Sequence, residues 1–142
     1  MTTARRTEHA PLDRLLVQVE RQVSRRMEAV LTDDGLTVDQ WRVLDLLADG
    51  AGRTMSAIAA AVAVPGPTLT KVVDRLVDAA AVYRLADVRD RRRVLVFLSD
   101  DGRATHERLA PLVRGIAADV LTVLGADGPA LLTLLGRLTA ER

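Results

Sequence analysis

Residues 65–99 decide the fold, and they read PGPTLTKVVDRLVDAAAVYRLADVRDRRRVLVFLS. The stretch opens with a tight Pro-Gly-Pro break, in which Pro67 suits the first position of a helix because its missing N–H needs no partner there. Apolar residues then recur every three or four positions to about Ala80, which predicts a helix. The pattern changes afterwards to two short strands at 82–85 and 94–98, joined by an arginine-rich loop. A helix followed by a hairpin with a basic tip is typical of a winged helix-turn-helix.

The first helix of such a motif is expected immediately upstream. Residues 53–55 could form a short strand, and Ser56 can cap a short helix after it. Further upstream, Thr37 and Gln40 have the spacing of a capping box, in which each side chain bonds the backbone of the other, and they predict the start of another helix. The winged module is therefore predicted to span residues 36–99.

Long amphipathic helices flank the winged module on both sides. Apolar residues repeat at helical spacing over about 10–31, Ser99 can cap a second long helix, and a final helix begins near residues 127–129. These apolar stripes exceed what a small winged module needs for its own core. We therefore expect residues 10–32 and 100–142 to pair two copies of the chain, since burial stabilises by about 25 cal/mol per Å². The alternative is one larger monomeric core.

The composition fits one globular domain over residues 1–142, because 49% of the residues are hydrophobic and 27% are charged. The chain has no cysteine, which excludes disulfides, thiolate metal sites and thiol redox switches. No apolar run has the length of a signal peptide core or a membrane span, so we expect a cytoplasmic protein without a membrane partner. The predicted fold class is mainly α with a small β-hairpin.

The net charge of +1 hides an uneven distribution. Residues 53–98 contain 8 basic and 4 acidic side chains, whereas residues 1–52 contain 7 and 9, and residues 99–142 contain 5 and 6. By subtraction, the middle segment carries +4 between flanks of −2 and −1. A positive module between acidic flanks favours a polyanion partner, because basic residues that neutralise phosphates release counterions. Double-stranded DNA is the partner that this fold predicts.

The helix after the Pro-Gly-Pro break carries the residues expected to read DNA. Its apolar side chains fall on one face, and four polar side chains of the other face are assigned to DNA binding: Thr68, Thr70, Lys71 and Arg75. Lys and Arg can bond guanine O6 and N7, while Thr hydroxyls suit phosphates or base edges. Asp74 does not suit a phosphate, and it could orient Arg75 or Arg91, or accept from cytosine N4.

The loop between the two strands is expected to act as the wing. It places four arginines close together, where they repel one another: Arg89, Arg91, Arg92 and Arg93. Asp87 and Asp90 could offset this repulsion by pairing with some of them and stiffening the loop. We expect Arg91 and Arg92 to reach a narrow minor groove. Arg89 and Arg93 are the arginines expected to pair with the two aspartates. Arg93 is therefore assigned, with Asp87 and Asp90, to stabilising the wing, and Arg89 is assigned to DNA binding as well. The alternative is a solvated charged turn.

Four segments carry a family resemblance: LTVDQW at 36–41, the helix from Pro67 to Ala80, the wing DVRDRRR at 87–93, and VLVFLSDDG at 94–102. Together they resemble the MarR family of bacterial transcription regulators, over nearly the whole chain. The resemblance implies a homodimer whose first and last two helices entwine, with two recognition helices on a pseudo-palindromic operator. It further implies a repressor that a small aromatic or phenolic effector releases. The chain departs from the family at Ala79–Ala81, where a Gly usually follows the recognition helix, and this predicts a differently shaped helix end.

An enzyme needs a nucleophile with a base, or a metal site, and the sequence offers neither. His9 and His106 are far apart and lack the spacing of a zinc site, so exposed or capping histidines are the favoured interpretation. No glycine motif that cradles phosphate is present. Trp41, the sole tryptophan, is interpreted as a core residue. We expect no catalysis, metal or cofactor, and the remaining alternative is a winged-helix module that binds protein instead of DNA.

Overall fold

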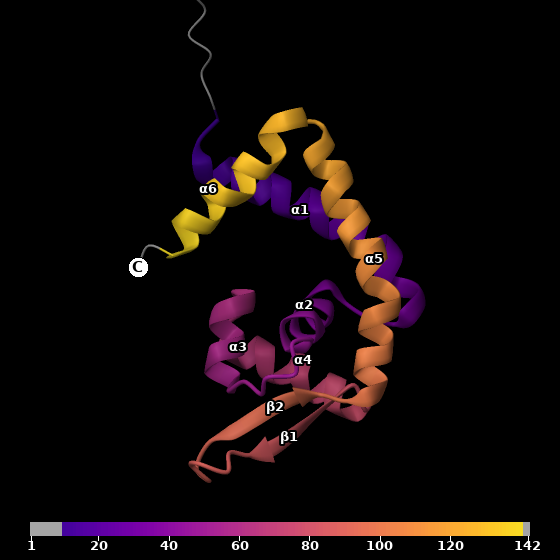
Figure 1. The fold of residues 1–142 in the computed structure, drawn as a ribbon, viewed down its shortest axis with the longest axis vertical. Coiled ribbons are helices and arrows are strands. Elements are labelled where there is room, and N and C mark those ends of the chain that lie inside the picture. The colour runs from indigo at the N-terminus through magenta and orange to yellow at the C-terminus, as the bar shows by residue number, and fades with distance from the viewer. Residues whose placement is uncertain (1–9, 141–142) are drawn as a thin grey trace, which may run out of the picture.

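The computed structural model describes residues 10–140, and within them the predicted order of the helices and of the hairpin is confirmed. The helices are α1 (Leu12–Leu31), α2 (Val38–Leu47), α3 (Met55–Val62), α4 (Gly66–Asp78), α5 (Asp100–Thr122) and α6 (Gly128–Ala140). Strands β1 (Val82–Ala86) and β2 (Val94–Leu98) form the hairpin, and the 3-10 turns η1 (Thr32–Asp34) and η2 (Gly125–Asp127) follow α1 and α5. The fold is mainly α with one small β-hairpin, as predicted (Figure 1).

The winged module and the flanking helices lie at opposite ends of the molecule (Figure 1). At the lower end, α2, α3 and α4 lie above the hairpin, whose tip points away from the body. At the upper end lie α1, the last turns of α5, and α6. Helix α5 runs from the hairpin to the upper end, so a single continuous helix connects the two parts.

Helices α3 and α4 form the helix-turn-helix. They are bent by 107° relative to each other across a short break, which lies within the 90–120° that is typical of the motif. Ala63, in a left-handed conformation with φ of 55°, makes the turn. By length and composition this bent pair could form a membrane span, whereas no single helix among residues 10–140 is long and apolar enough to do so.

Two apolar clusters hold these parts together. The first lies inside the winged module and consists of Val43, Leu44, Leu47, Ile58, Leu69, Val73, Leu76, Val82, Val96 and Leu98. The second joins α1, α2 and α5 through Met27, Leu31, Val38, Trp41, Leu109 and Ala110. Trp41 is 2% exposed, which confirms its interpretation as a core residue. Because α2 contributes to both clusters, it is the element on which the winged module and α5 meet.

Three helix starts were predicted from their sequence signals. The start of α2 is confirmed, and the starts of α3 and α4 differ from prediction by two residues and one residue. The capping box of α2 is confirmed, since Gln40 N–H donates to Thr37 Oγ1 at 3.1 Å and Thr37 N–H donates to Gln40 Oε1 at 3.0 Å. Thr54, not Ser56, caps α3, because its Oγ1 accepts from a backbone N–H three residues ahead at 3.2 Å. Pro67 is the second residue of α4, where an N–H would again have no intrahelical partner.

The strand predicted at residues 53–55 is reduced to a single β-bridge between Arg53 and Val96. The two residues exchange both backbone bonds, Arg53 N–H to Val96 O at 3.2 Å and Val96 N–H to Arg53 O at 2.8 Å. The strand prediction is therefore wrong beyond Arg53, because Thr54 already caps the next helix. Within the hairpin, β1 and β2 pair antiparallel from Val82 opposite Leu98 to Ala86 opposite Val94.

The end of α4 keeps the left-handed turn that a glycine usually makes, with Ala80 N–H donating to Val77 O and Ala81 N–H donating to Leu76 O, both at 2.9 Å, so the expectation of a differently shaped helix end is wrong. The helix ends at Asp78, two residues before the predicted Ala80, and Ala80 adopts a left-handed conformation with φ of 58°. Ser99 braces this turn, because its hydroxyl donates to Ala80 O at 2.6 Å and its N–H donates to Ala81 O at 3.0 Å. The same hydroxyl accepts from Gly102 N–H at 3.0 Å and so caps α5, as predicted.

The interpretation of His106 as an exposed or capping residue is wrong. Its side chain is 10% exposed and lies against α2, where its ring stacks on that of Trp41 with centroids 5.0 Å apart. Its Nε2–H donates to Asp45 Oδ1 at 2.8 Å, since an ionised carboxylate can only accept. Asp45 is 61 residues away in sequence, so no local pattern could have indicated this partner. The other histidine, His9, lies outside the described residues.

Candidate nucleic-acid interface

Helix α4 presents its polar face to solvent. Leu69, Val73 and Leu76 point into the core of the winged module and are at most 1% exposed. All four residues predicted to read DNA are exposed: Thr68, Thr70, Lys71 and Arg75. The Thr70 hydroxyl donates to Gly66 O at 3.1 Å, so its oxygen remains available as an acceptor. The helix spacing thus brings two cations and two hydroxyls onto accessible parts of one short helix.

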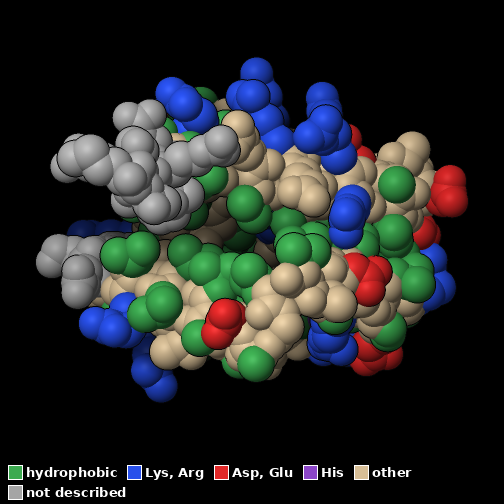
Figure 2. Space-filling view, turned by 90° about the horizontal axis from the view of Figure 1, so that it is seen from above, with side chains coloured by type: hydrophobic (Ala, Val, Ile, Leu, Met, Phe, Trp, Pro, Cys, Tyr) green, Lys and Arg blue, Asp and Glu red, His purple; other side chains and the backbone are tan. Residues whose placement is uncertain are grey.

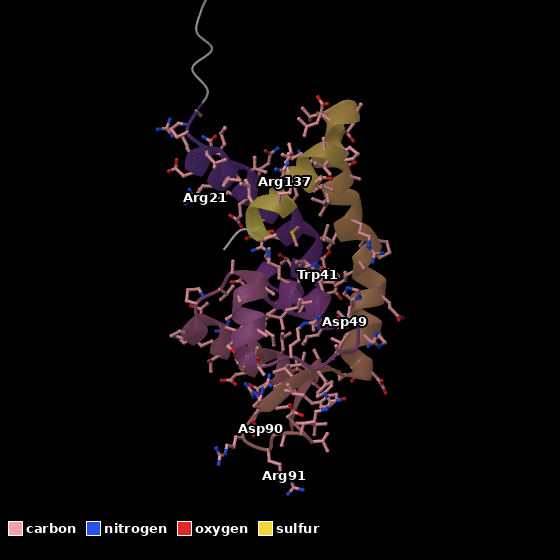
Figure 3. The ribbon with its side chains drawn as sticks, turned by 60° about the vertical axis from the view of Figure 1, so that its left-hand side comes forward. Arg21, Trp41, Asp49, Asp90, Arg91 and Arg137 are labelled. Carbon is pink, nitrogen blue, oxygen red and sulfur yellow. The ribbon has the colours of Figure 1, made fainter. Side chains whose placement is uncertain are left out.

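Asp74 pairs with a residue of the hairpin. Its Oδ1 accepts from Arg84 Nη2 at 2.6 Å, and Arg84 lies on the neighbouring strand β1. The suggestion that Asp74 orients Arg75 or Arg91 is wrong, because successive helix residues do not face each other and Arg91 lies at the distant wing tip (Figure 3). The Asp74–Arg84 pair joins the recognition helix to the hairpin. It also neutralises a carboxylate next to Arg75.

The wing carboxylates bond the backbone. Asp87 Oδ1 accepts from Arg89 N–H at 3.0 Å, and Asp90 Oδ1 accepts from Arg92 N–H at 3.1 Å. Backbone bonds close the loop, from Asp87 N–H to Arg93 O at 2.8 Å and from Arg93 N–H to Asp90 O at 3.0 Å. These are Asx turns, which a short carboxylate forms readily with the N–H two residues ahead. Within residues 87–93, all of them described, no ion pair joins an aspartate to an arginine, contrary to expectation.

The four wing guanidinium groups consequently have no carboxylate partner within the described part of the chain. All four arginines are exposed, and Figure 3 shows Arg91 extending from the wing tip away from the body. Arg93, expected as an internal ion-pair partner, takes part in the loop only through its backbone. Two guanidinium charges at about 4 Å repel by about 1 kcal/mol in water, so a polyanion placed against the wing would be favoured.

Two hydroxyl residues that were not predicted to bind DNA lie near this surface: Thr54, which was predicted to lie in a short strand, and Ser56, which was predicted to cap a helix. Thr54 and Ser56, at the start of α3, line an open hollow of about 590 Å³ together with Arg92 and Arg93. Their Oγ1 and Oγ atoms are 3.3 Å apart. Hydroxyls and guanidiniums are common phosphate ligands in protein–DNA complexes. The position of this hydroxyl pair, at the start of the first helix of a helix-turn-helix, was the signal in the sequence.

Two basic residues of the positive segment are committed to internal contacts. Arg84 binds Asp74, and Arg53 forms a two-pronged pair with Asp49, from Nη1 to Oδ1 at 2.9 Å and from Nη2 to Oδ2 at 2.7 Å. The hydrogen bond from Arg53, assisted by one from the Ala51 N–H, lowers the pKa of Asp49 to about 2. The charge excess in the sequence therefore overstates the cations available to a partner. The remaining six basic side chains of residues 53–98 lie on α4 and the wing.

Comparisons with known proteins agree with this geometry. A model of the MarR family matches residues 34–93. The chain is similar to the multiple antibiotic resistance protein MarR of Escherichia coli (strain K12), at 33% identity over 103 residues that cover 72% of each chain. It is similar to the solved structure of NadR in complex with 4-hydroxyphenylacetate, at 28% identity and a TM-score of 0.83 over 100% of both chains. It is also similar to the transcriptional repressor CouR bound to a 23-mer DNA duplex, at 31% identity and a TM-score of 0.77 over 90% of this chain and 92% of that chain.

An exposed polar helix after a 107° turn, followed by a hairpin with arginines at its tip, defines a winged helix-turn-helix DNA-binding protein. The similarity to known regulators extends over most of the chain. The chain belongs to the MarR family of transcription regulators.

Proposed function

We propose that the chain acts as a homodimeric repressor that reads a pseudo-palindromic operator. In each protomer α4 enters the major groove, and the wing reaches the adjacent minor groove or backbone. The observation that carries this proposal is a set of six exposed cations without a carboxylate partner in the described residues: Lys71, Arg75, Arg89, Arg91, Arg92 and Arg93. The DNA-bound structure of the similar repressor CouR supports the same use of this fold.

The two parts of this surface are assigned different tasks. Lys71 and Arg75 lie one helical turn apart on α4 and are proposed to bond base edges, with Thr68 and Thr70 on phosphates or bases. The wing arginines are proposed to anchor the protein to the phosphate backbone or inside a narrow minor groove. Asp87 and Asp90 shape the loop that presents them. Loss of the α4 side chains is therefore expected to change sequence preference, and loss of the wing arginines is expected to change the affinity for all sequences.

The apolar faces of the flanking helices support the homodimer. Large apolar side chains on α1, α5 and α6 are 42–60% exposed in the single chain, including Leu12, Leu15, Leu16, Val19, Leu112, Leu132, Leu134 and Leu138. Figure 2 shows hydrophobic side chains gathered across the upper end of the molecule, with Lys and Arg along its margins. Contiguous apolar patches of this kind mark interaction sites in soluble proteins. A second copy would bury them and hold two α4 helices at a fixed separation.

We further propose that a small acidic effector releases the operator. NadR, which the chain resembles, was solved with 4-hydroxyphenylacetate. The aromatic rings of this chain already pair with each other, Trp41 with His106 and Tyr83 with Phe97, so charged groups are the better candidates for holding an acid. Arg42 lies in a hollow of about 700 Å³ between α1 and α2, which Arg21 and Arg25 also line, and its two ion pairs, with Glu20 at 3.4 Å and Asp39 at 3.8 Å, are long and solvent-exposed, so an acid can replace them. Titration with aromatic acids should release bound DNA, and Arg42→Ala should weaken that response.

Regulation by DNA binding, without catalysis, is proposed as the whole activity. The only histidine among residues 10–140 is buried against Trp41 and bonds Asp45, and no hydroxyl nucleophile of that range hydrogen-bonds its ring. No group of three or more His, Cys, Asp or Glu residues in that range could hold a metal ion. The cytoplasm is the proposed location, because the proposed partner is the cell's own DNA.

The test compares three double variants by their affinity for a duplex at several salt concentrations. Arg91→Ala/Arg92→Ala is expected to weaken binding to all sequences and to reduce the salt slope by about 0.9 for each phosphate that the wing no longer neutralises. Lys71→Ala/Arg75→Ala is expected to cost about 1–3 kcal/mol at the base pairs that these residues read, and so to relax specificity. Arg26→Ala/Arg114→Ala removes the same charge from exposed positions on α1 and α5, and it serves as the control once sedimentation shows that this variant is still a dimer, because both helices carry the proposed dimer contact.

The effects of the two test variants are separable. If the wing variant binds with the affinity and salt slope of the control, the wing does not contact DNA and the module is better explained as a protein-binding one. If the α4 variant retains the sequence preference of the wild type, α4 is not the reading helix.

A further inference from the structure

The first half of α5 is fastened along one side of α2 by polar contacts that the DNA interface does not use. His106 Nε2–H donates to Asp45 Oδ1 at 2.8 Å, and its ring stacks on Trp41 at an interplanar angle of 11°. Arg103 Nη1 donates to Ala48 O at 3.0 Å, at the end of α2. One turn beyond His106, Leu109 is buried in the cluster that contains Trp41.

The contacted residues of α2 form a helical stripe. Trp41, Asp45 and Ala48 are spaced by four and three residues, so they lie on one face of the helix. A further pair joins Arg108 Nη2 to Asp34 Oδ1 at 2.7 Å, on the turn that precedes α2. The polar contacts and the apolar packing beneath them fix both the position and the rotation of α5 relative to the winged module.

The second half of α5 belongs to the other part of the molecule. The helix continues without interruption to Thr122, and beyond Pro111 it carries Leu112, which is 54% exposed. This half lies on the face that the proposed function assigns to the partner copy. Helix α5 therefore contacts the winged module at its start and carries the proposed dimer contact at its end. The contacts between α5 and α2 fix the orientation of the winged module relative to the dimer contact.

We propose that the contact of His106 with Asp45 and Trp41 is the joint that sets the separation and orientation of the two recognition helices, and that His106 and Asp45 are positioning residues for operator reading. This inference rests on the proposed homodimer. Inserting one base pair between two half-sites moves them apart by about 3.4 Å and rotates one against the other by about 34°. A stiff joint makes the protein reject such an operator, whereas a loosened joint lets each module adjust.

The experiment uses a duplex selected from random sequence by the wild-type protein, the same duplex with one base pair inserted at its centre, and a duplex holding a single half-site. The variants are Asp45→Ala and His106→Leu, with Glu107→Ala as the control. Asp45 has a 60% exposed side chain, so its replacement should leave folding intact even if His106→Leu does not fold. Glu107 is an exposed acidic residue adjacent to His106 on α5.

The wild type and Glu107→Ala are expected to bind the inserted duplex about tenfold more weakly than the selected one, which is the scale of one hydrogen bond to a charged group. Asp45→Ala and His106→Leu are expected to reduce this preference to about threefold or less, with half-site affinity unchanged. If Asp45→Ala keeps the tenfold preference, or loses half-site affinity by the same factor as full-site affinity, the joint does not act as described. If the wild type itself shows no spacing preference, the proposed dimeric reader fails instead.

Discussion

Replacing Gly102 by alanine is expected to destabilise the protein at the junction of α4, β2 and α5. A Cβ at this position would overlap the Ala81 carbonyl oxygen and would lie 2.8 Å from Leu98 Cδ1. The Ala81 oxygen is not free to move, because it accepts from Ser99 N–H at 3.0 Å. Gly102 N–H in turn donates to Ser99 Oγ at 3.0 Å, so a shift of α5 that relieves the overlap also strains its cap.

The magnitude follows from these contacts. Overpacking against atoms that cannot move costs about 1–3 kcal/mol, and weakening the Ser99 cap costs about 1 kcal/mol more. The better helix propensity of alanine raises the free energy of unfolding by at most about 1 kcal/mol. The free energy of unfolding should therefore fall by about 1–3 kcal/mol.

Urea unfolding at one fixed protein concentration measures this change, because the stability of a dimer depends on concentration. Gly115→Ala is the control within the same helix, since in the single chain no atom outside its own stretch of helix lies within 4 Å of its would-be Cβ. It should stabilise the protein by up to about 1 kcal/mol through helix propensity alone. An unfolding free energy for Gly102→Ala within about 0.5 kcal/mol of wild type would refute the argument that this glycine is required by close backbone contact.

Three further predictions concern single side chains. Arg53 lowers the pKa of Asp49 from 3.8 to about 2, so Asp49→Asn should lower the free energy of unfolding at neutral pH. The difference in unfolding free energy between this variant and the wild type should vanish as the pH falls from about 4 to about 2, because the carboxylate becomes protonated. An unchanged difference at pH 2 would contradict the pairing. Thr37→Ala should cost about 1 kcal/mol in urea unfolding, and a negligible loss would mean that the capping box with Gln40 is not formed. Asp90→Asn keeps an acceptor for the loop and removes a negative charge near the DNA. It should raise DNA affinity about twofold at low salt, because two unit charges about 8 Å apart in water interact by about 0.5 kcal/mol. Asp90→Ala should weaken binding instead, and equal effects of the two variants would exclude the turn-forming role.

The element order was predictable because each helix and strand carries its own local signal. Capping residues such as Thr37 and Ser99 act within four residues, and the hairpin follows from the change of apolar period, so no long-range knowledge was needed. The errors arose where two local signals compete. Thr54 and Ser56 are both good N-caps, and a single β-bridge at Arg53 leaves the same pattern as the start of a longer strand.

The residues of the site were identified more easily than their partners. Exposure of Lys71 and Arg75 follows from helix periodicity, which is local. The pairing of Asp74 with Arg84 depends on how β1 lies beside α4, and the contact of His106 with Asp45 depends on the packing of α5 against α2. In the wing, an aspartate can satisfy either an arginine or a backbone N–H, and only the shape of the loop selects between them.

Selection of bound sequences from random duplex DNA tests the central claim most directly. A homodimer that reads DNA with α4 should enrich two inverted half-sites whose centres lie about 10 base pairs, or a multiple of that, apart. Lys71→Ala/Arg75→Ala should lose the enrichment at defined positions within each half-site. Enrichment of a single asymmetric site, or of no sequence at all, would contradict the account of this chain as a dimeric operator reader.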